Sequence, residues 1–102
     1  MQKITLFIGL NDKDTKTQIW SFNAAAEVLG DYIAQKIGFG TLSKAAGIYT
    51  HENGETVQET TIKAEFYTED KTPIMEFVKF AKSTLNQESI SMEVTTPAVE
   101  FV

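Results

Sequence analysis

The chain of 102 residues contains no cysteine and no arginine, and its single histidine is His51. Without cysteine there is no disulfide, no thiolate metal site and no cysteine nucleophile. One histidine excludes a metal centre built from several histidines and a mechanism that uses a histidine pair. No apolar run approaches the roughly 20 residues that span a bilayer. We therefore expect a small globular protein that uses neither thiol nor multi-histidine chemistry.

The charge is unbalanced as well. Nine lysines stand against 14 aspartates and glutamates, which gives a formal net charge of -5. Arginine is the usual bidentate ligand of phosphate and guanine, and phosphate neutralisation supplies most non-specific affinity for nucleic acid. The composition predicts no direct binding to nucleic acid and no binding to an anionic membrane surface. The charge favours solubility or a basic partner.

Strands are predicted wherever apolar residues alternate with polar ones. Such alternation runs over four segments, 3–10, 41–50, 56–68 and 89–96. Pro97 places the last of them at a sheet edge, because proline cannot donate to a ladder. A three-residue hairpin loop with Gly54 in the left-handed region puts Ile48 and Ile62 on one face, whereas a two-residue loop would separate them. We therefore predict the three-residue loop.

Helical spacing of apolar residues predicts one helix over 17–37 and a second over 73–86. Thr15 or Thr17 has the position of an N-cap for the first helix, and Gly38 suits its left-handed end. The Thr-Pro pair before the second helix supplies an N-cap and a proline at the first helical position.

These elements give the order βαββαβ. Two right-handed crossovers joined by a hairpin predict an α+β, ferredoxin-like fold. Its four-stranded antiparallel sheet has the strand order 4-1-3-2, and both helices cover one face. We expect one such domain over 1–102, with a core that needs no cofactor to fill it.

The other face of the sheet is predicted to be open and to form an interaction surface. Its residues are Phe7, Tyr49, Val57, Glu59, Glu65, Tyr67 and Glu93. Aromatic residues supply much of the energy of protein interfaces, and surrounding carboxylates steer a protein toward a basic surface. We expect a homodimer or a basic host protein as the partner. An alternative is a homodimeric α+β barrel that binds a small ligand between two open faces.

No group of residues in the sequence has the pattern of a catalytic or metal site. The acidic turn at 11–14 lacks the glycine and glutamate of a calcium loop, so we interpret it as a solvated turn that caps the helix. Glu52 and Glu55 flank a turn tip, where burial cannot raise a carboxyl pKa, and His51 lies in the same turn. The sequence therefore predicts a non-enzymatic protein with no catalytic, cofactor-binding or metal-binding residues.

Two segments, Leu6–Gln18 and Gly47–Gly54, resemble small uncharacterised proteins encoded by phages and prophages of Gram-positive bacteria. The resemblance implies an accessory protein in the cytoplasm of the bacterial host. Acidic phage proteins of this size include inhibitors of host defence, such as anti-CRISPR proteins, which occupy a basic nucleic-acid site. The resulting expectation is a non-enzymatic interaction module, in the manner of such inhibitors.

Overall fold

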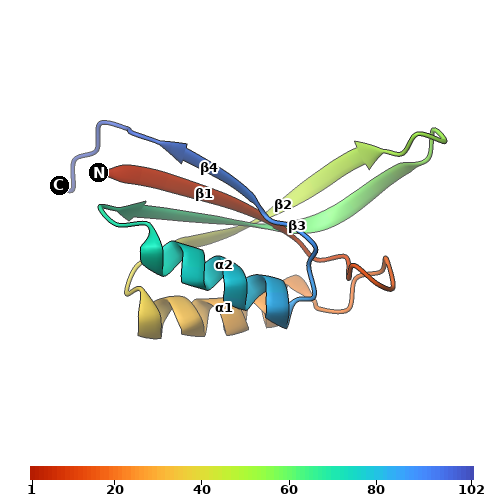
Figure 1. Ribbon diagram of the computed structural model, residues 1–102, viewed down its shortest axis with the longest axis horizontal. Helices are drawn as coiled ribbons and strands as arrows, with labels where there is room; N and C mark the ends of the chain where they lie inside the picture. Colours follow the sequence, from red (N-terminus) through yellow and green to blue (C-terminus); the bar gives the residue numbers. More distant parts are fainter.

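A computed structural model describes residues 1–102 and has the predicted element order (Figure 1). The elements are β1 (Gln2–Gly9), α1 (Phe22–Lys36), β2 (Thr41–Thr50), β3 (Thr56–Thr68), α2 (Thr72–Thr84) and β4 (Ser91–Thr95). The strands form one antiparallel sheet in the order β2-β3-β1-β4, and both helices lie against the same face of it. The ferredoxin-like prediction, with β4 at an edge, is confirmed.

The register of the β2–β3 hairpin is the predicted one. Ile48 pairs with Gln58, and Leu42 pairs with Ala64. His51 N–H donates to the Glu55 carbonyl at 2.8 Å, which closes a three-residue loop in which Gly54 has φ +86°. Glycine takes this left-handed conformation without the clash that a Cβ would bring. The distal half of this hairpin projects beyond both helices (Figure 1).

The core lies between the helices and the inward face of the sheet. β1 contributes Ile4, Leu6 and Ile8, all fully buried, and β3 contributes Ile62, Ala64 and Phe66. α1 adds Ala25, Leu29 and Ile33, and α2 adds Ile74, Phe77 and Ala81. The aromatic rings of Phe66 and Phe77 meet edge to face with centroids 5.5 Å apart. The sheet and the two helical stripes thus fill the core from one side of the sheet, and the other side stays open.

The start of α1 differs from the prediction. The helix begins at Phe22, and Ser21 is its N-cap, with the Ala24 N–H donating to Ser21 Oγ at 3.1 Å. Thr15 and Thr17 cannot cap it, because they belong to a separate turn in which the Asp12 N–H donates to the Thr17 carbonyl at 2.8 Å. Gly38, with φ +94°, follows the helix as predicted.

At α2 the cap lies one residue earlier than predicted. Thr72 is the first helical residue, and Lys71 is an N-cap that makes no side-chain hydrogen bond. Asp70 Oδ1 accepts from the Thr72 N–H at 2.9 Å and takes over that role. This bond lowers the pKa of the Asp70 carboxyl below its ordinary value, because it favours the charged form.

β4 and the C-terminal segment are the least covered parts of the sheet. Met92 and Val94 are on the inward face by register, yet each is more than a third exposed. Beyond β4 the chain returns toward the N-terminus, where the Phe101 ring meets the edge of Tyr67 at 6.2 Å (Figure 1). Neither helix is long and apolar enough to cross a membrane.

Candidate functional site

The open face of the sheet carries all seven residues of the predicted interaction surface. Strand pairing puts Phe7 beside Lys63, Glu65 beside Thr5, and Val57 beside Tyr49. Glu93 pairs with Thr5 from the other side, and Glu59 and Tyr67 alternate with inward residues along β3. The seven residues share a face, but they do not form one cluster. Glu65 and Tyr67 belong to an ion-paired group near the chain termini, and three others line a cavity near the base of the hairpin. Val57 and Glu93 belong to neither.

The ion-paired group centres on Glu65. Its carboxylate lies 3.1 Å from Lys3 Nζ and 3.5 Å from Lys63 Nζ. The hydrogen bond and charge of Lys3 lower the pKa of Glu65, and Glu65 in turn raises the pKa of Lys3. Lys3 also lies over the Tyr67 ring, 6.0 Å from its centroid. Two lysines therefore compensate the charge of Glu65.

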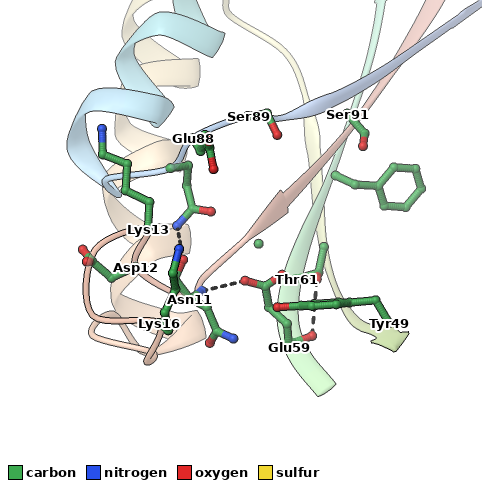
Figure 2. Close-up of a pocket in the computed structure, with 13 residues that line it drawn as sticks. Asn11, Asp12, Lys13, Lys16, Tyr49, Glu59, Thr61, Glu88, Ser89 and Ser91 are labelled. Atoms are coloured by element: carbon green, nitrogen blue, oxygen red, sulfur yellow. Dashed lines mark hydrogen bonds between the residues drawn. The ribbon is translucent and has the colours of Figure 1, made fainter. Parts of the chain in front are cut away.

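The cavity, of about 370 Å³, lies where the end of β1 meets the β1–α1 loop, the hairpin and the α2–β4 connection (Figure 2). Small-molecule sites occupy roughly 300–1,000 Å³. Its lining residues are Phe7, Gly9, Asn11, Asp12, Lys13, Lys16, Tyr49, Glu59, Thr61, Gln87, Glu88, Ser89 and Ser91. Of the predicted surface, only Phe7, Tyr49 and Glu59 reach it. Val57, Glu65, Tyr67 and Glu93 lie outside it.

The Glu59 carboxylate is held in place on one side of the cavity. Its Oε2 accepts a hydrogen bond from the Asn11 backbone N–H at 2.8 Å. The carboxylate rests over Gly9, so close that a Cβ built there would lie 2.4 Å from Oε1. In Figure 2 Glu59, Thr61 and Tyr49 lie along one side of the cavity, and Ser89 and Ser91 lie along the opposite side. The fold thus presents a fixed carboxylate beside an aromatic ring.

The wall formed by the β1–α1 loop is anchored by Asp12. This side chain is 8% exposed, and its Oδ2 accepts from the N–H groups of Asp14 and Thr15, each at 3.0 Å. Its Oδ1 accepts from Asn86 Nδ2 at 2.8 Å. The Thr15 and Asn86 hydrogen bonds lower the pKa of the Asp12 carboxyl. The prediction of a solvated turn that caps the helix is wrong for Asp12, because it joins the loop to the end of α2.

The lining has the chemistry of a site for a polar ligand that carries both signs of charge. Glu59 and Glu88 attract a cation, and Lys13 and Lys16, neither of which forms an ion pair, attract an anion. Phe7 and Tyr49 are 39% and 44% exposed and offer their rings to an aromatic or apolar group. No group of three or more His, Cys, Asp or Glu residues is arranged to hold a metal ion.

Several residues of this cavity were missed by sequence reasoning. Asn11 and Glu88 sit in connections whose patterns carry no periodic signal, and the cavity forms only where these connections meet. One signal was present at Gly9. An isolated glycine inside a strand pattern suggests that another group approaches the backbone closely, and here that group is the Glu59 carboxylate.

No known protein family and no curated relative matches this sequence. Solved structures do match its fold. A phage SAM lyase in complex with S-methyl-5′-thioadenosine is 22% identical with a TM-score of 0.64, over 92% of this chain and 79% of that one. A phage SAM lyase in the apo state is 17% identical with a TM-score of 0.65, over 92% of this chain and 78% of that one. CutA from Synechococcus elongatus is 12% identical with a TM-score of 0.58, over 94% and 75%.

At these identities the likeness concerns the fold. The structural likeness agrees with the sequence resemblance to phage proteins at the level of the fold, because one of the similar folds belongs to a small phage protein. The prediction of a non-enzymatic interaction module is contradicted, since an enzyme shares this fold over most of the chain. That prediction treated a complete core as evidence against chemistry, but a core filled from the helix side leaves the open face free for a ligand. The homodimer and the basic host protein stay predictions.

Proposed function

We propose that this chain binds S-adenosylmethionine in the cavity beside Glu59 and cleaves it to S-methyl-5′-thioadenosine. The observation that carries the proposal is a fixed carboxylate next to an aromatic ring, inside a cavity of a fold that a phage SAM lyase shares. The phage context implied by the sequence resemblance supports it, because an enzyme that removes this methyl donor would impair host methyltransferases.

The chemical groups of S-adenosylmethionine match the lining of the cavity. Its adenine suits the exposed rings of Phe7 and Tyr49, since flat aromatic groups stack on such side chains. Its α-ammonium suits the Glu59 carboxylate. The hydroxyls of Ser89 and Ser91 can hydrogen-bond the ribose.

The bond that breaks follows from the product. S-methyl-5′-thioadenosine lacks the four-carbon amino-acid unit, so the bond between the sulfonium sulfur and Cγ of that unit must break. We propose that the substrate's own carboxylate attacks Cγ while the S–Cγ electron pair moves to sulfur. The second product is then homoserine lactone. The step takes up no proton, water or co-reactant, and it requires only that the carboxylate be oriented toward Cγ.

This route assigns Glu59 to the ammonium rather than to the sulfonium. The sulfonium charge disappears during the reaction, so a carboxylate beside it would stabilise the substrate more than the transition state. The ammonium keeps its charge throughout. Glu59 can therefore bind the ammonium and hold the amino-acid unit in place while the substrate's own carboxylate closes on Cγ.

The test is incubation of the purified protein with S-adenosylmethionine, with both products followed by liquid chromatography. We expect S-methyl-5′-thioadenosine and homoserine lactone to appear in equal amounts. Loss of a hydrogen bond to a charged group is worth about 1.5–3 kcal/mol, so Glu59→Gln should lower kcat/KM about ten- to a hundredfold. Glu93→Gln is the matched control, because Glu93 lies on the same face outside the cavity. A wild-type protein that forms no product above the spontaneous rate would refute the proposal.

A further inference from the structure

We infer that Gly9 is a positioning residue for Glu59, and that its lack of a side chain sets where the carboxylate meets the substrate ammonium. The inference rests on the proposed function for its catalytic meaning. Its structural part, that Gly9 and the Asn11 amide together seat this carboxylate, stands on the geometry alone.

The seat has two components. Below the carboxylate, a Cβ at Gly9 would lie 2.4 Å from Oε1, 2.5 Å from Cδ and 2.6 Å from Oε2, so all three atoms occupy the space of a missing side chain. Beside it, the Asn11 N–H donates to Oε2 at 2.8 Å. Oε1 receives no hydrogen bond from the protein and remains available to a ligand.

The amide that anchors the carboxylate is itself fixed from another part of the chain. Gln87, 8% exposed, donates through Nε2 to the Asn11 carbonyl at 2.9 Å and to the Leu85 carbonyl at 3.1 Å. The Leu10 N–H donates to the Thr60 carbonyl at 3.0 Å, which holds the chain just before Asn11. Figure 2 shows the hydrogen bond between Asn11 and Glu59 as a dashed line.

The nearest obstacle to a side chain at Gly9 is the Glu59 carboxylate. Ordinary contact with a Cβ begins at 3.4 Å, so alanine would push the carboxylate away by about 1 Å. Gly9 does not have a positive φ, so alanine fits its backbone. The displaced atoms are the free end of a flexible side chain, which can move without disturbing the strands.

The first measurement does not depend on enzyme activity. We would record amide hydrogen exchange by NMR for the wild type, Gly9→Ala and Glu59→Ala. The Asn11 amide should exchange about tenfold faster in both variants, while the Leu10 amide, bonded to the Thr60 carbonyl, keeps its protection. Gly30→Ala is the control, because a Cβ there meets nothing within 4 Å. If the Asn11 amide kept its protection in Gly9→Ala, the inference that Gly9 and this amide together position the Glu59 carboxylate would be wrong.

The second measurement is the kinetics of S-adenosylmethionine cleavage. Gly9→Ala should raise KM about tenfold, whereas a partly unfolded sample would lower kcat and leave KM unchanged. Shortening the acid in the double variant Gly9→Ala/Glu59→Asp withdraws the carboxylate from the new methyl group. The double variant should therefore lose less than the two single losses combined. Unchanged KM in Gly9→Ala, with the Asn11 amide deprotected, would overturn the positioning role. An inactive wild type would refute the proposed function, and the hydrogen-exchange data would still test whether Gly9 and the Asn11 amide position the carboxylate.

Discussion

At the scale of single residues, Asp12 shows how one side chain can join two distant connections. It accepts three hydrogen bonds, two from its own loop and one from Asn86, which follows α2. Asn86 reaches it from a left-handed conformation with φ +51° and donates to Asp14 as well, at 2.9 Å. The wall of the cavity therefore depends on a carboxylate that need not touch any ligand.

The charge of Asp12 predicts a pH dependence of stability. Its pKa lies below the ordinary 3.8 in the folded state, so the unfolded chain takes up the proton first as the pH falls. The stabilisation by this group is present at neutral pH and is lost as the pH falls below 3.8 through the lower, folded-state pKa. We expect Asp12→Asn to be less stable than the wild type at pH 7, with the difference shrinking toward pH 2. Urea unfolding at several pH values measures this.

Asp31→Asn is the control, because Asp31 is exposed on α1. It should change the free energy of unfolding little at any pH. A gap between Asp12→Asn and the wild type that stays constant with pH would contradict the assignment of this stability to the carboxylate.

At the scale of elements, α1 carries a glycine that no contact requires. A Cβ at Gly30 would meet nothing within 4 Å, so no close approach by another segment requires a glycine there. Glycine inside a helix costs about 0.5–1 kcal/mol relative to alanine, mainly because it loses more backbone freedom on folding. Gly30→Ala should therefore raise the free energy of unfolding by about that amount, measured by urea denaturation.

Gly38 provides the opposite case in the same region. Its Cβ position is equally open, but its φ is +94°, a conformation that alanine reaches only with strain of about 1–2 kcal/mol. Gly38→Ala should lower the stability while Gly30→Ala raises it. If both substitutions changed the free energy of unfolding in the same direction, the φ angle would not determine the effect of alanine at these two positions.

At the scale of the whole molecule, the charges on the outward face of the sheet govern whether two copies can meet through it. Its Lys3–Glu65–Lys63 group holds one more positive than negative charge, whereas the whole chain carries a net charge of -5. Copies that meet through this face therefore repel mainly through their remaining carboxylates. Salt screens such repulsion over about 10 Å at 0.1 M.

Self-association through this face stays a prediction, and it can be measured. We expect light scattering to show a mass that rises with protein concentration, and more so at higher salt. Tyr67→Ala should weaken the association. Ile48→Ala is the control, because Ile48 is 70% exposed on the opposite face. A constant monomer mass at every concentration and salt level would contradict the prediction.

The sequence by itself determined the sheet, its strand order and the faces of its strands, because alternation along β1, β2 and β3 separates core from surface. Gly54 and the apolar pattern together fixed the hairpin register. The cavity was decided only by the tertiary structure. Glu59 and Asn11 are 48 residues apart, and Gln87 reaches Asn11 across 76 residues. Periodicity reports on neighbours within an element, whereas this carboxylate owes its position to contacts between connections that carry no periodic pattern.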